Sequence, residues 1–157
     1  MSWLFAFVHH VAAFALVAAL TAEFVVLRGD LTVQRARQVL AADLAFGVSA
    51  SAILVVGFLR VFYFEKGASY YFHSVPFILK LTLFAIVGLL SIYPTVEFLS
   101  WRKQVKEGRA PVISERKLRS VRAVIHWELI AIALLILCAA LMARGVWVLS
   151  LPASQVL

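Results

Sequence analysis

The stretch Tyr70–Leu99, which reads YYFHSVPFILKLTLFAIVGLLSIYPTVEFL, decides the fold because it is long and apolar enough to cross a lipid bilayer. It nevertheless carries two side chains that cost free energy in hydrocarbon, His73 and Lys80. Their spacing of seven residues puts both on one face of a helix, with roughly 10 Å of rise between them. We therefore expect this face to point into a protein interior and not toward lipid.

The composition of the whole chain indicates an integral membrane protein. Of its 157 residues 64% are hydrophobic, and the mean hydropathy is +0.97, whereas soluble domains are roughly 45–50% apolar. Four segments reach the ~20 residues that a spanning helix needs, at about residues 3–27, 39–62, 71–99 and 123–149. The sequence thus predicts an all-α fold in which residues 1–157 form one transmembrane domain, a four-helix bundle.

The net charge of +7 is explained by membrane topology. Basic residues are concentrated in the connections 28–38 and 100–122, and such loops face the cytoplasm by the positive-inside rule. Both termini are then expected on the outer, periplasmic side of a bacterial inner membrane. The basic loops would also attract anionic lipid head groups, so membrane lipid is an expected partner and nucleic acid is not.

Polar groups expected in the outer half of the bundle suggest a haem site. This set consists of His9, His10, Arg60, His73, Lys80 and Arg144. A histidine of the first span and one of the third, at similar depth, are able to ligate one haem iron from opposite faces. The nearby cations would hold the haem propionates. No CxxCH motif occurs and Cys138 is the lone cysteine, which excludes covalent c-type haem and a cysteine metal cluster.

Polar groups expected in the inner half suggest a different site. This set consists of Glu23, Asp43, Glu97, His126 and Glu128. Buried carboxylates beside histidine are typical of proton relays and cation sites, although Glu97 and His126 would also be explained as solvated helix-end residues. Glu23 is the deepest, on a face of the first span that also carries His9 and Leu16.

Three stretches resemble an uncharacterised bacterial family of four-span membrane proteins, a domain of unknown function. They are VHHVAAFALVAALTAEFVVLR, YYFHSVPFILKLTLFAIVGLLSIYPTVEFLSWR and HWELIAIALLILCAALMARG. That family is similar, at a distance, to the copper-resistance D proteins and to the flavin-independent membrane protoporphyrinogen oxidase. The resemblance implies b-type haem, held by a histidine of the first span and by a histidine and a lysine of the third.

Carried over to this chain, the resemblance assigns the first-span ligand to His9 or His10 and the third-span pair to His73 and Lys80. The sequence departs from the pattern here, because the oxidase group has its histidine and lysine very close together. In this chain they are seven residues apart, and Ile78 stands two before Lys80. This departure argues against porphyrinogen oxidation in particular.

The first functional hypothesis is therefore an inner-membrane haem b protein with an electron-transfer or oxidoreductase role, acting on a quinone or porphyrin or with a redox partner. His9, His10 and His73 are its candidate iron ligands, and Arg60, Lys80 and Arg144 its candidate propionate or substrate contacts. Lys80 and Glu23 are the candidate catalytic residues. The alternatives are a metal- or ion-handling transporter and a structural subunit without chemistry, and the sequence leaves open whether the bundle forms a homo-oligomer.

Overall fold

The protein is a bundle of long helices. The computed structural model describes residues 2–59, 62–63 and 75–144. The regular structure of these residues is helical, and its four long helices are α1 (Ser2–Val26), α2 (Val33–Leu59), α4 (Val75–Lys106) and α5 (Glu115–Ala143). Each is long and apolar enough to cross a membrane. The predictions of an all-α fold and of four spans are thus confirmed.

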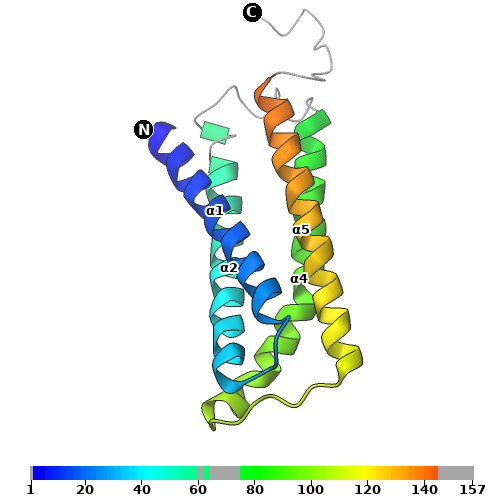
Figure 1. Ribbon diagram of the computed structural model, residues 1–157. Helices are drawn as coiled ribbons and strands as arrows, with labels where there is room; N and C mark the ends of the chain where they lie inside the picture. The colour runs from blue at the N-terminus through cyan, green and yellow to red at the C-terminus, as the bar shows by residue number, and fades with distance from the viewer. Residues whose placement is uncertain (1, 60–61, 64–74, 145–157) are drawn as a thin grey trace, which may run out of the picture.

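The helices alternate in direction and form two hairpins. α1 packs along α2 and α4 packs along α5, while α2 with α4 and α1 with α5 make the smaller contacts between the hairpins (Figure 1). The connections 27–32 and 107–114 lie together at one end, which we call the basic end because most of the arginines and lysines of the chain lie in these connections and in the adjoining helix turns. The start of α1 and the end of α5 lie at the opposite end.

Three helices extend beyond the predicted apolar spans at the basic end. α2 begins at Val33 instead of residue 39, α5 begins at Glu115 instead of residue 123, and α4 continues to Lys106 instead of ending at 99. The 32 residues of α4 measure about 48 Å, more than the ~30 Å of hydrocarbon. The helices therefore continue beyond the apolar segments, through residues that are polar enough to lie in a head-group region.

Local signals fix the helix ends at the basic end. Thr32 Oγ1 accepts a hydrogen bond of 3.2 Å from the backbone N–H of Arg35, and Ser114 Oγ accepts one of 3.4 Å from Lys117 N–H. These are the caps of α2 and α5. After α4, Gly108 has φ +73°, the left-handed conformation that commonly follows the last turn of a helix.

Pro94 lies inside α4 and does not end it. Proline removes one backbone hydrogen bond and clashes with the preceding turn, so a bend is expected at this position. The C-terminal part of α4 does turn aside from the rest of the helix, toward the start of α2 (Figure 1). This bend brings the end of α4 against the first turns of α2.

Burial follows the pattern of a membrane protein. Large apolar side chains such as Phe14, Leu44 and Leu89 are 76%, 68% and 70% exposed, as lipid-facing residues are. The largest fully buried side chains all lie in the half of the bundle nearer the basic end: Leu20, Leu27, Val39, Phe98, Trp101, Val121, Ile125 and Glu128. The tightest packing is therefore at the basic end, and it includes a carboxylate.

We predict that Trp101→Ala destabilises the bundle by about 3–5 kcal/mol, because it opens a cavity where the indole is 1% exposed. The measurement is thermal or denaturant unfolding of the detergent-purified protein. Trp127→Ala is the matched control, since this indole is 62% exposed. Equal losses for the two variants would contradict the placement of the core.

Candidate functional site

One face of α1 turns inward from Ala12 to Glu23, as the sequence predicted. Ala12, Leu16 and Ala19 are buried, and Glu23 on the same face is only 2% exposed. The small residues let α2 approach closely, which explains why α1 makes its most extensive contacts with α2. Glu23 is thus carried into the interior by the helix face that forms the core.

A second buried carboxyl group, from α5, lies within electrostatic range of Glu23. Glu128 is 1% exposed, and its Oε1 atom, like that of Glu23, has no hydrogen-bond partner. Buried polar atoms in native proteins are nearly always hydrogen-bonded, and each exception needs a physical explanation. Two such exceptions of the same chemistry, in one region of the bundle, mark this region as the strongest candidate site.

Asp43 of α2 completes a cluster of three acids. Glu23 lies within electrostatic range of both Asp43 and Glu128, and Glu128 lies within range of Asp43. Asp43 Oδ1 accepts a hydrogen bond of 2.6 Å from the Thr95 hydroxyl of α4. Three helices thus supply the acids and the fourth supplies a hydroxyl donor. We call Glu23, Asp43 and Glu128 the carboxylate cluster.

No basic side chain neutralises the carboxylate cluster in the part of the chain that the structure describes. The nearest candidate along α5, Arg122, donates its Nε–H instead to the backbone carbonyl of Leu27 at 2.7 Å. That bond ties the end of α1 to α5 across the basic end. The sequence analysis did not identify Thr95 or Arg122 as neighbours of these acids. The one sequence feature that pointed to them was their expected depth, which is close to that of the acids on the neighbouring spans.

The structure divides the predicted inner set into two parts. Glu97 is 8% exposed but fully partnered, because Lys117 Nζ lies 2.5 Å from its Oε2 and Trp101 Nε1 donates to its Oε1 at 3.1 Å. Glu97 is therefore a buried acid whose ion-pair partner Lys117 is exposed, and it is not a solvated helix-end residue. His126 is exposed and stacks on Phe24, with ring centroids 5.9 Å apart, so it lies on the outside of the bundle.

The two adjacent histidines of α1 have different surroundings. The ring of His9 is half-buried and faces α2, where a Cβ atom on Gly57 would lie 3.5 Å from His9 Cε1. His10 is exposed, and its Nδ1 lies 2.6 Å from the carbonyl oxygen of Ala6. His9 is therefore the member of the pair that the bundle holds inward.

The rest of the predicted haem site is described only in part. Lys80 is half-buried near the start of α4, and Arg144 is exposed just after α5. His73 and Arg60 lie outside the described residues, as do residues 71–74 at the start of the third predicted span and 145–149 at the end of the fourth. Among the described residues, no group of three or more histidine, cysteine, aspartate or glutamate side chains is placed to hold a metal ion.

We predict that Glu23→Gln and Glu128→Gln leave the melting temperature unchanged or raise it, because each replaces an unpartnered acid with a neutral amide of nearly the same shape. Glu97→Gln is the matched control, and it should lower the melting temperature because Lys117 loses its ion pair. The measurement is thermal unfolding in detergent at neutral pH. A clear loss of stability in both cluster variants would show that these acids have partners.

Comparison with known proteins places the chain in a family without assigning it an activity. Residues 1–147 match the family described as a predicted membrane protein (DUF2214), so this chain belongs to that family. Neither the curated proteins nor the solved structures gave a match. The family description agrees with the four spans, and it is silent on substrate, cofactor and partner.

Proposed function

We propose that this protein handles protons inside the membrane, and that the carboxylate cluster is its proton-binding site. The observation that carries the proposal is the pair Glu23 and Glu128, which are 2% and 1% exposed and each leave a side-chain oxygen without a hydrogen-bond partner. An acid in this setting is expensive as an anion. A proton is the simplest partner that removes this cost.

The chemistry of the three acids suits proton exchange. Groups within electrostatic range of one another do not titrate independently, so a proton taken up by one changes the affinity of the others. Asp43 differs from its neighbours because it is partly exposed and holds the Thr95 hydrogen bond. Asp43 is thus suited to pass protons between the surroundings and the two fully buried acids.

The expected orientation gives this site a direction. With the basic end in the cytoplasm of a bacterial inner membrane, the cluster takes protons from the cytoplasmic side. It delivers them toward the opposite half of the bundle, where His9 and Lys80 lie. Such a delivery serves either a transported ion or an electron-transfer reaction.

Proton flux into proteoliposomes tests the proposal. A potassium diffusion potential is imposed with valinomycin, and the internal pH is followed with an entrapped dye. We predict flux above that of empty vesicles for the wild type and a loss to the background for Glu23→Gln and Glu128→Gln, since an amide cannot release a proton. Glu23→Asp should retain part of the flux.

Glu115→Gln is the control for this experiment, because it removes an exposed acid from the first turn of α5. It should leave the flux unchanged. Equal flux in the wild type and in the two cluster variants, or none above empty vesicles in the wild type, would contradict the proposal.

A second candidate function is a b-type haem protein that transfers electrons, with a quinone or another redox partner as its electron donor or acceptor. The observation that favours it is the inward-facing imidazole of His9, which lies beside a helix position without a side chain, Gly57. Neutral imidazole is a common axial ligand of haem iron. His9 would hold the iron, Lys80 would contact a propionate, and the haem would supply one-electron transfer.

The visible absorption spectrum of the purified protein, oxidised and dithionite-reduced, tests this second candidate. After haem-replete expression we predict a Soret band that is lost in His9→Ala and retained in His10→Ala, because the His10 ring faces outward. The absence of the band from the wild type, or its equal loss in both variants, would exclude His9 ligation of haem.

A further inference from the structure

A cationic hollow lies at the basic end, apart from the carboxylate cluster. It has a volume of about 210 Å³ and lies between the first turns of α2 and the last turns of α4. Its lining consists of three cations and three apolar residues: Arg37, Leu40, Ala41, Arg102, Val105 and Lys106. No acid contributes to the lining.

The cations of the hollow are not used by the protein itself. Arg37, Arg102 and Lys106 are exposed, and in the part of the chain that the structure describes none of them forms an ion pair with a carboxylate. Of the acids at this end, Glu97 pairs with Lys117 and Glu107 pairs with Arg109, and Asp30 and Glu115 form no ion pair with these three cations among the described residues. The positive charge of the hollow is therefore available to an external anion.

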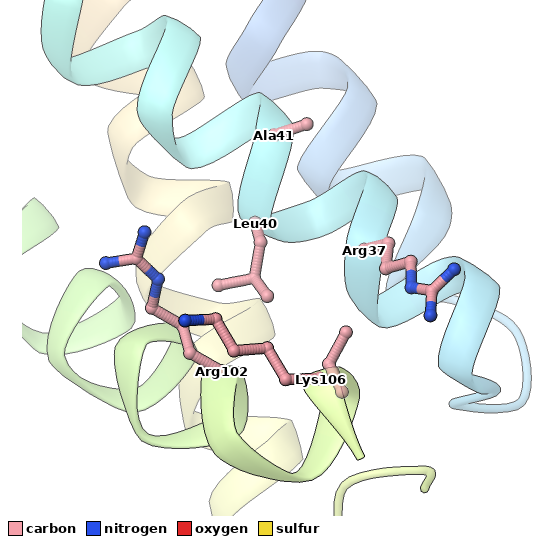
Figure 2. A pocket seen from close by; sticks show the side chains of 6 residues that line it. Arg37, Leu40, Ala41, Arg102 and Lys106 are labelled. Carbon is pink, nitrogen blue, oxygen red and sulfur yellow. The ribbon is translucent and has the colours of Figure 1, made fainter. Parts of the chain in front are cut away.

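The arrangement of the side chains separates a polar rim from an apolar floor. Figure 2 shows the Leu40 side chain between α2 and α4, the Lys106 side chain passing below it and the Arg102 guanidinium to its left, while the Arg37 side chain turns to the other side. Val105 is buried beneath the hollow. An occupant would thus meet the two cations of α4 and an aliphatic surface, while the Arg37 guanidinium lies apart from them.

The depth of the hollow in the membrane identifies the occupant. The last turns of α4 carry Arg102, Lys103 and Lys106 after its apolar segment, so we expect them in the head-group layer and not in hydrocarbon. Continuing along α2 from Ala41 toward the bilayer, Leu44 and Val48 are 68% and 62% exposed and offer a surface to acyl chains. We propose that this hollow binds the phosphate of an anionic phospholipid, whose chains lie along α2.

A free phosphate ion would bind the same cations, but it would gain nothing from the apolar surface around them. Arg and Lys side chains near an anionic membrane surface attract its lipid head groups. The aliphatic floor and the exposed apolar face above it contribute only when the anion carries acyl chains. Phosphatidylglycerol is therefore the appropriate probe, and phosphatidylcholine and inorganic phosphate are the comparisons.

The test is lipid titration of the full-length, detergent-purified protein, followed by native mass spectrometry and by the melting temperature. We expect the wild type to bind phosphatidylglycerol in preference to phosphatidylcholine. In the double variant Arg102→Gln, Lys106→Gln the affinity for phosphatidylglycerol should fall roughly tenfold or more, as the loss of two basic contacts implies. The control double variant Arg116→Gln, Arg119→Gln removes two exposed cations of α5 outside the hollow. It should reduce the affinity for phosphatidylglycerol far less.

A second variant tests the shape of the hollow without changing its charge. Ala41→Phe places a ring at an exposed position that lines the hollow, so it should weaken phosphatidylglycerol binding while all three cations remain. Circular dichroism verifies that each variant stays helical.

Three outcomes would overturn the inference. Equal losses in the two double variants would mean diffuse attraction by the whole basic end. Unchanged binding in Ala41→Phe would place the lipid elsewhere. Stabilisation by millimolar inorganic phosphate to the same extent as by phosphatidylglycerol would mean that the hollow accepts a free anion and not a lipid.

Discussion

The structure depends on one constraint, that hydrocarbon offers no hydrogen-bond partner to a polar group. Helices satisfy the backbone internally, and the same rule governs the side chains within the spans. The hydroxyls of Thr21, Ser51 and Thr82 each donate to the carbonyl four residues earlier on their own helix, at 2.7, 2.9 and 2.9 Å. Glu97 is paired with Lys117 and Trp101. Glu23 and Glu128 stand out because each has a buried oxygen that does not follow this rule.

The sequence predicted the architecture well because the same constraint is visible in composition. Four apolar segments and two basic connections define four helices, and the periodicity of α1 correctly placed Leu16 and Glu23 on the buried face. The helix bounds at the basic end were less accurate. Polar residues such as Gln34 and Arg116 continue α2 and α5 beyond the lipid, where hydropathy no longer reports on helix formation.

The candidate site was only partly predictable. The sequence predicts the depth of a residue and the helix face on which it lies, but it does not predict which side chains of the neighbouring helices the residue contacts. The sequence grouped five inner polar residues, but only the packing separates Glu97, which has Lys117, from Glu23 and Glu128. Likewise it could not choose between His9 and His10, whereas their surroundings differ clearly in the structure. The predicted ligand His73 lies outside the described residues and stays a prediction.

The two ends of the bundle differ in packing and in charge. The tight core, the paired Glu97 and the cationic hollow lie toward the basic end, and the carboxylate cluster lies just inside this rim. A tightly packed surrounding holds acids in place without supplying them with counter-charges, and rigid placement of a few polar groups is what a functional site requires. Under the proposed function, the stability that the bundle loses by burying Glu23 and Glu128 without partners serves proton binding.

The most direct measurement is the infrared spectrum of the protein in lipid at neutral pH, in the region of the C=O stretch of protonated carboxylic acids. The account predicts a band that shifts in heavy water, that is lost when both Glu23 and Glu128 are replaced by glutamine, and that is unaffected by Glu115→Gln. A spectrum without this band, or a band that survives in the double variant, would contradict the claim that these buried acids hold protons.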